Sequence, residues 1–231
     1  MQVSKNVLEI ESADTICRVP GAIAWNYSRS ETIADLAVHI IGLCLGYTAA
    51  AVLLALAAIH EERTDFVAAL VYALSLLLML TLSAAYNLWP VCPLKWRLRR
   101  FDHSAIYVLI AATYTPFVLK PGAVAPGVLA VMWCVAALGV AIKFALPGRL
   151  DHLSIGVCVA MGWSGAILWG SNDTPMLPVA YHYLLAGGML LSLGVVFHVW
   201  RNLRYQNAIW HAFVLLGISC HYVAVCQVVL S

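Results

Sequence analysis

Long apolar stretches recur along this chain, and short polar segments separate them. A helix that crosses a lipid bilayer needs about 20 mainly apolar residues. The stretches lack the strict alternation of transmembrane β-strands, so the pattern favours helices over a barrel. The predicted spans are Leu36–Ile59, Phe66–Trp89, Ala105–Leu119, Val124–Leu146, Leu153–Trp169, Met176–Trp200 and Ala208–Leu230.

The composition supports the same fold class. Of the 231 residues, 63% are hydrophobic and 10% are charged, whereas soluble domains carry about 25% charged residues. The sequence therefore predicts an all-α integral membrane protein, a seven-transmembrane helix bundle in residues 31–231. Residues 1–30 have mixed charge and no apolar core, so they are predicted to form a cytoplasmic tail rather than a cleavable signal peptide.

The distribution of lysine and arginine predicts the orientation of the bundle. If the spans alternate in direction, Arg63 and Lys120 fall on one side and the other eleven of the 13 basic residues fall on the opposite side. Basic residues favour the cytoplasmic face, which places the N-terminus in the cytoplasm and the C-terminus outside. The predicted location is the plasma (inner) membrane. Membrane lipid is the expected partner, and no nucleic-acid partner is expected.

Strongly polar residues near the spans fall mostly on the predicted cytoplasmic side. Polar groups inside a membrane are costly and are commonly tied to function. Several of them are spaced four residues apart, which puts them on one face of a helix, so the sequence predicts stripes that meet inside the bundle. The cluster consists of Glu31, Asp35 and His39 at the first span, Ser83 and Asn87 at the second, Asp102 and His103 at the third, and Asn207 and His211 at the seventh.

Part of this cluster also has a purely structural interpretation. Asp102 and Asn207 stand where they would cap the third and seventh helices. Thr32 and Asp35 fit the spacing of a capping box. His211 is equally compatible with a hydrogen-bonded packing residue that holds no metal. Capping does not explain the polar residues that lie deeper within the spans.

Short motifs in this chain resemble those of the hemolysin III family. That family belongs with the progestin and adiponectin receptors and, more distantly, with the alkaline ceramidases, a group of CREST-type membrane hydrolases. The resemblance runs from about Tyr27 to the C-terminus. It rests on Tyr27–Glu31 followed by Asp35 and His39, and on Ser83–Asn87, Arg99–Ser104, Thr113–Phe117 and Asn207–Val214.

The resemblance implies a zinc ion near the cytoplasmic side of the bundle. In the family, three histidines bind the ion, and a serine and an aspartate complete the site. Carried over, the serine is Ser83, the aspartate is Asp102, and the ligand positions are 87, 207 and 211. This chain keeps His211 but has Asn87 and Asn207 at the other two positions.

Two interpretations of this departure stay open. A carboxamide oxygen is a weaker zinc ligand than an imidazole nitrogen, which favours loss of the metal and a hydrogen-bonded polar core in its place. Alternatively, a neighbour such as His39 or His103 supplies a substitute ligand.

Three functions are compatible with these observations. The first is a non-catalytic protein that binds lipid or serves membrane homeostasis, or a degenerate lipid hydrolase. The second is a zinc-dependent hydrolase of lipid amides of the ceramide type, with Ser83 and Asp102 as catalytic residues. The third is a pore-forming, cytolytic protein, which the family's name alone suggests. Whether the chain is an enzyme is left open by its sequence.

Overall fold

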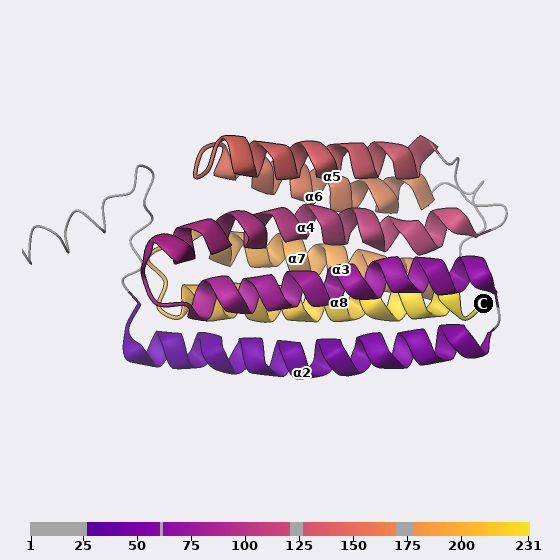
Figure 1. Ribbon diagram of the computed structural model, residues 1–231, viewed down its shortest axis with the longest axis horizontal. Coiled ribbons are helices and arrows are strands. Elements are labelled where there is room, and N and C mark those ends of the chain that lie inside the picture. Colours follow the sequence, from indigo (N-terminus) through magenta and orange to yellow (C-terminus); the bar gives the residue numbers. More distant parts are fainter. Residues whose placement is uncertain (1–26, 61, 121–126, 170–177) are drawn as a thin grey trace, which may run out of the picture.

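The all-helical fold class is confirmed by the computed structural model, which describes residues 27–60, 62–120, 127–169 and 178–231. The described residues form seven α-helices that run along the long axis of the molecule (Figure 1). The first 26 residues, which include most of the predicted tail, lie outside the described part. The helices are α2 (Arg29–Ile59), α3 (Arg63–Leu88), α4 (Pro93–Leu119), α5 (Gly127–Ala145), α6 (Asp151–Trp169), α7 (Pro178–Val199) and α8 (Gln206–Val229).

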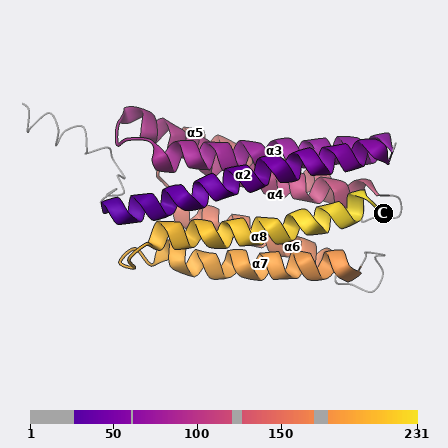
Figure 2. The same cartoon turned by 90° about the horizontal axis from the view of Figure 1, so that it is seen from below.

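Helix α4 is central to the bundle and contacts α3, α5, α6 and α8. Helix α2 lies beside α3 and α8 (Figure 2), and α7 contacts both α6 and α8. The start of α2 and the C-terminus lie at opposite ends of the bundle. These contacts bring the first helix beside the last, and no local sequence pattern specifies that pairing.

Five of the described helices are long and apolar enough to cross a membrane, namely α2, α3, α5, α7 and α8. Many large hydrophobic side chains on their outer faces are exposed, as expected for contact with lipid. Helix α4 is not among the five, and its first half carries five charged residues. Because α4 is central, its polar side chains can contact other helices rather than lipid. The described structure therefore supports a multi-pass membrane protein.

Helices α2 and α4 begin much earlier than predicted, whereas the other five starts differ from the predictions by two or three residues. Helix α4 starts at Pro93 rather than at Ala105, so the basic segment predicted as a connection is helical. Proline suits the first turn of a helix, and the Lys, Arg and Leu residues that follow are good helix formers. Helix α2 starts at Arg29 rather than at Leu36.

The predicted helix caps are wrong. Asp102 lies well inside α4, and the residue before α8 is Tyr205 rather than Asn207. At α2 the capping box is formed by Ser28 and Glu31, not by Thr32 and Asp35. The Ser28 amide donates to Glu31 Oε2 over 2.9 Å. Because capping does not occupy their side chains, Asp35, Asp102 and Asn207 are available for tertiary contacts.

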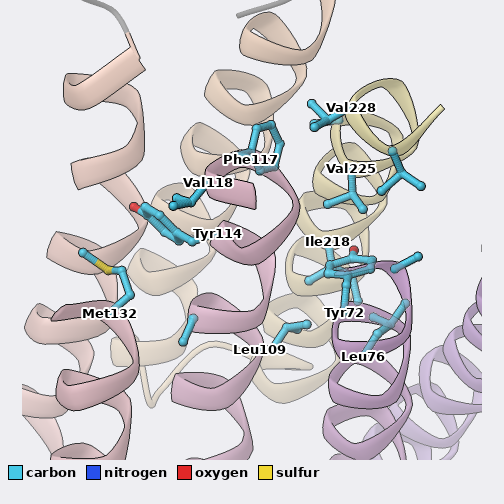
Figure 3. Packing of buried hydrophobic residues seen from close by; sticks show 14 of the residues in the cluster. Tyr72, Leu76, Leu109, Tyr114, Phe117, Val118, Met132, Ile218, Val225 and Val228 are labelled. Atoms are coloured by element: carbon cyan, nitrogen blue, oxygen red, sulfur yellow. The ribbon is translucent and has the colours of Figure 1, made fainter. Parts of the chain in front are cut away.

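The apolar core is built mainly from residues of α3, α4, α5 and α8 around the central helix α4 (Figure 3). Tyr72 on α3 and Val225 on α8 are almost completely buried there, and Phe117 is a buried aromatic residue that α4 contributes to the same cluster. Lipid tails are as apolar as these side chains, so close van der Waals packing rather than removal from water stabilises the cluster. The core fixes α8 against α3 and α4, and thereby sets the position of the polar residues further along these helices.

Candidate functional site

Asp35 joins α2 to α8 through both of its carboxylate oxygens. His211 Nδ1 lies 2.7 Å from Asp35 Oδ1, and Asn207 Nδ2 donates to Asp35 Oδ2 over 2.9 Å. Asn207 and His211 are one turn apart on α8, so a single carboxylate contacts both members of the stripe. Asp35 is buried, and a buried carboxylate needs partners of this kind.

His39 lies one turn beyond Asp35 on α2 and is also buried. Its Nδ1 is 2.8 Å from the backbone oxygen of Asp35, so Nδ1 carries the donated hydrogen. Its Nε2 faces the Ser83 hydroxyl on α3 at 3.4 Å. The rings of His39 and His211 meet edge to face, with centroids 4.4 Å apart. The two imidazoles therefore belong to one site.

Asn87 closes the site from α3. Its Nδ2 donates to the Ser83 backbone oxygen over 2.9 Å and lies 3.4 Å from His211 Nε2. Its Oδ1 accepts from Asn207 Nδ2 at 3.2 Å. The stripes on α2, α3 and α8 thus meet as the spacing predicts, and the two asparagines act as hydrogen-bonding bridges.

The remaining predicted residues surround this centre. Asp102 is buried on α4 and interacts with the Ser83 side chain. His103 Nδ1 lies 3.1 Å from Asp102 Oδ2 without hydrogen-bond geometry, and its ring packs against Tyr86. Glu31 stands at the rim, where its Oε1 accepts from the Tyr205 backbone amide over 3.0 Å.

Asp35, His39 and His211 form a group of suitable metal ligands. One ligand atom from each lies within 4.8 Å of the others. Two imidazoles and a carboxylate are a donor set that zinc accepts, commonly with an open fourth position. His39 directs Nδ1 to the Asp35 backbone oxygen, which leaves its Nε2 lone pair for a metal. His211 Nδ1 faces the Asp35 carboxylate itself, so a metal shared by these two residues would take the place of the hydrogen between them. The ligand positions implied by the resemblance fit zinc poorly here, whereas this neighbouring set is a suitable donor group.

This geometry distinguishes between the two suggested substitute ligands. His39 lies in the group with His211, whereas His103 does not belong to it. His39 was predicted from the sequence as a substitute ligand, but spacing within one helix did not reveal that the other candidate ligands are Asp35 and His211. That grouping depends on the contact between α2 and α8.

A cavity of about 770 Å³ opens beside this site. It reaches from Asp35 and Asp102 past Tyr114 to Phe117. Asp102 and Phe117 are 15 residues apart on α4, which corresponds to about 22 Å of helix. The inner lining comes mainly from apolar residues of α4, α6, α7 and α8, including Trp163 and Leu191. Sequence reasoning missed this cavity, because its lining comes from the packing of several helices rather than from a motif.

Sequence reasoning also missed a buried ion network next to the cavity. Arg99 Nη2 and Lys143 Nζ contact the two carboxylate oxygens of Asp151 at 2.6 and 2.7 Å. The network joins α4, α5 and α6. The signal in the sequence that could have revealed it is Lys143, a lysine in the last turn of the apolar helix α5.

Comparison with known proteins identifies relatives that match most of the chain. The hemolysin-3 homolog of Bacillus subtilis (strain 168) is 33% identical over 201 residues, which is 86% of this chain and 94% of that protein. Hemolysin-3 of Bacillus cereus is 33% identical over 84% of this chain and 90% of that protein. The human monocyte to macrophage differentiation factor is 28% identical over 72% of each. No solved structure matches the chain significantly.

The family described as haemolysin-III related matches residues 27–222. The match includes every predicted site residue and excludes most of the N-terminal tail, in agreement with the resemblance of the motifs. The chain is therefore a member of the hemolysin III family, which belongs with the progestin and adiponectin receptors.

Proposed function

We propose that this protein binds an amphiphilic membrane lipid without necessarily converting it. The observation that carries this proposal is one continuous cavity, lined by Asp35, Asn87, Asn207 and His211 at one end and by apolar side chains beyond them. Its volume of about 770 Å³ lies in the range of small-molecule sites. The polar head would meet the cluster, and the tail would occupy the apolar part.

The polar end is suited to binding because its side chains are already ordered. Asp35, Asn87 and Asn207 are held by hydrogen bonds from three different helices. A site that is ordered before binding loses less conformational entropy when its ligand arrives. The excess of basic residues near this end supports a cytoplasmic position for it, with all seven described helices crossing the plasma membrane.

The test is to fill the cavity from helix α6. Gly162 lines the cavity, and a Cβ added there meets nothing within 4 Å. We expect Gly162→Leu to reduce the lipid that native mass spectrometry detects on the purified protein. Gly156→Leu is the matched control, because its Cβ also meets open space but Gly156 does not line the cavity. Equal lipid retention in both variants would contradict the proposal.

A second candidate is a metal-dependent hydrolase of lipid amides. The arrangement of Asp35, His39 and His211 favours it, because these ligand atoms already converge. Zinc bound there would act as a Lewis acid toward a lipid carbonyl. The Ser83 hydroxyl faces His39, and the Asp102 carboxylate faces Ser83. In this proposal Ser83 orients the substrate and Asp102 accepts a proton.

Metal content and amide hydrolysis separate the two candidates. A hydrolase is expected to hold about one zinc ion per chain and to release fatty acid from a ceramide. His39→Ala should lose the metal, whereas His103→Ala, on the other side of Asp102, should keep it. If the protein binds lipid but has neither zinc nor amidase activity, the hydrolase is excluded and the lipid-binding function remains.

A further inference from the structure

Two buried cations share a single carboxylate beside the cavity. Arg99 on α4 is 5% exposed and Lys143 on α5 is 3% exposed. Both contact Asp151, the first residue of α6. Within the described residues, Asp151 is the one carboxylate that forms an ion pair with Arg99 or with Lys143. The three side chains therefore carry one unbalanced positive charge. Burial of an uncompensated charge is costly, so a second anion would stabilise this group.

Arg99 has a donor left over. Among the described residues, its buried Nε atom has no hydrogen-bond acceptor, while its Nη2 is engaged by Asp151. Arg99, Lys143 and Asp151 all line the cavity. A guanidinium group binds phosphate and carboxylate oxygens through its N–H groups, so Arg99, which lines the cavity and has one donor unpaired, is suited to an anionic ligand.

The start of α6 adds a second source of positive potential. The first N–H groups of a helix have no acceptor within the helix, and the helix dipole favours an anion near them. The preceding residue, Leu150, has no side-chain acceptor that would cap them. Leu150 also has a φ of 59°, which is unfavourable for a leucine. Unfavourable backbone conformations of this kind are common at ligand sites. Residues 150–155 line the cavity.

We propose that Arg99, Lys143 and the N-terminus of α6 form a subsite for the anionic phosphate of a lipid headgroup, whose tail occupies the adjoining apolar cavity. The subsite is separate from the metal-ligand group, since it lies on α4, α5 and α6 rather than on α2 and α8. The inference rests on the proposed lipid-binding function and specifies its ligand class. A free phosphate ion shares the headgroup chemistry but lacks the tail.

The experiment measures binding to the full chain in a neutral detergent. Thermal unfolding is followed with short-chain phosphatidic acid, with diacylglycerol and phosphatidylcholine of the same chain length, and with inorganic phosphate. We expect phosphatidic acid to give the largest rise in the unfolding midpoint, because binding to the folded state stabilises it. An equal rise with inorganic phosphate would assign the subsite to a free anion and overturn the lipid assignment.

Substitutions separate a ligand site from a purely structural ion network. Asp151→Asn removes the anion that competes for both cations, so we expect affinity for phosphatidic acid to rise, whereas a structural network predicts no rise. Arg99→Gln keeps the Lys143–Asp151 pair and should lower affinity about tenfold or more, as for a charged hydrogen bond. Arg149→Gln, an exposed change nearby, is the control and should leave affinity unchanged.

The outcomes distinguish this inference from the function on which it rests. If the protein binds lipids without preference for an anionic headgroup, the subsite is wrong and the lipid-binding function stands. If no lipid binds, the proposed function fails first. If Asp151→Asn does not fold, Arg99→Gln decides alone, and unchanged affinity in that variant overturns the subsite.

Discussion

Asn207 Nδ2 lies 2.9 Å from Asp35 Oδ2, so an amide at a position where the family implies a zinc-binding histidine donates to a carboxylate instead. The same nitrogen also contacts Asn87 Oδ1 at 3.2 Å. The two substituted ligand positions are thereby bonded to each other and to α2. The altered residues are integrated into the site, and the candidate metal ligands shift toward Asp35 and His39.

This relationship predicts the effect of restoring histidine at both positions. In Asn87→His combined with Asn207→His, two new imidazoles would join His211, and imidazole binds zinc better than carboxamide. We expect zinc per purified chain to rise strongly, measured by elemental mass spectrometry. Asn202→His, an exposed change in the loop before α8, is the control. Unchanged zinc in the double variant would mean that the site is misplaced.

The carboxylate of Asp35 should matter for both stability and metal content. Asp35→Ala removes the acceptor of His211 and Asn207, and an unsatisfied buried group costs about 1–3 kcal/mol. We expect a lower unfolding midpoint and, if the metal-dependent candidate is correct, a lower zinc content. Asp65→Ala removes an equally buried carboxylate that pairs with Lys120. That control should lose stability and retain its zinc content; loss of zinc from both variants would point to general unfolding.

The close approach of α7 and α8 depends on Gly187. A Cβ at this position would lie 2.8 Å from the Gly217 backbone oxygen and would also meet the His221 ring. We expect Gly187→Ala to lower the free energy of unfolding by about 1–3 kcal/mol, the usual cost of overpacking. Gly188→Ala adds the same methyl group where the nearest contact is 3.9 Å, so it should be neutral or stabilising. Chemical denaturation of the two variants provides the measurement, and equal stability would contradict this packing.

The seven helices could be predicted from the sequence because apolar length is a local property. The start of α4 could not, since a span criterion stops at charged residues while the helix continues back through Arg99 to Pro93. The Ser28–Glu31 capping box was readable as a serine followed three residues later by glutamate, but Thr32 and Asp35 offered a competing assignment.

The site was predictable only in part, for a similar reason. Four-residue spacing placed the side chains on faces, and the faces meet as expected. Spacing does not tell which residues of different helices approach each other, so the contact of Asp35 with His211 and the pairing of Lys143 with Asp151 required the fold.

The Asp151 ion network should make the protein sensitive to acid. Asp151 lies ahead of the predicted span Leu153–Trp169. Burial raises its pKa, but hydrogen bonds and charges from Lys143 and Arg99 outweigh burial and lower that pKa from 3.8 to about 2. A carboxyl group with a lowered folded-state pKa stabilises the fold fully above its unfolded pKa and loses this effect as the pH falls toward its folded pKa. Without added lipid, wild type should therefore exceed Asp151→Asn in unfolding midpoint by a constant amount above about pH 5, and the difference should shrink as the pH falls toward about 2. A difference that stays constant over that acidic range would show that Asp151 is not held ionised by these two cations.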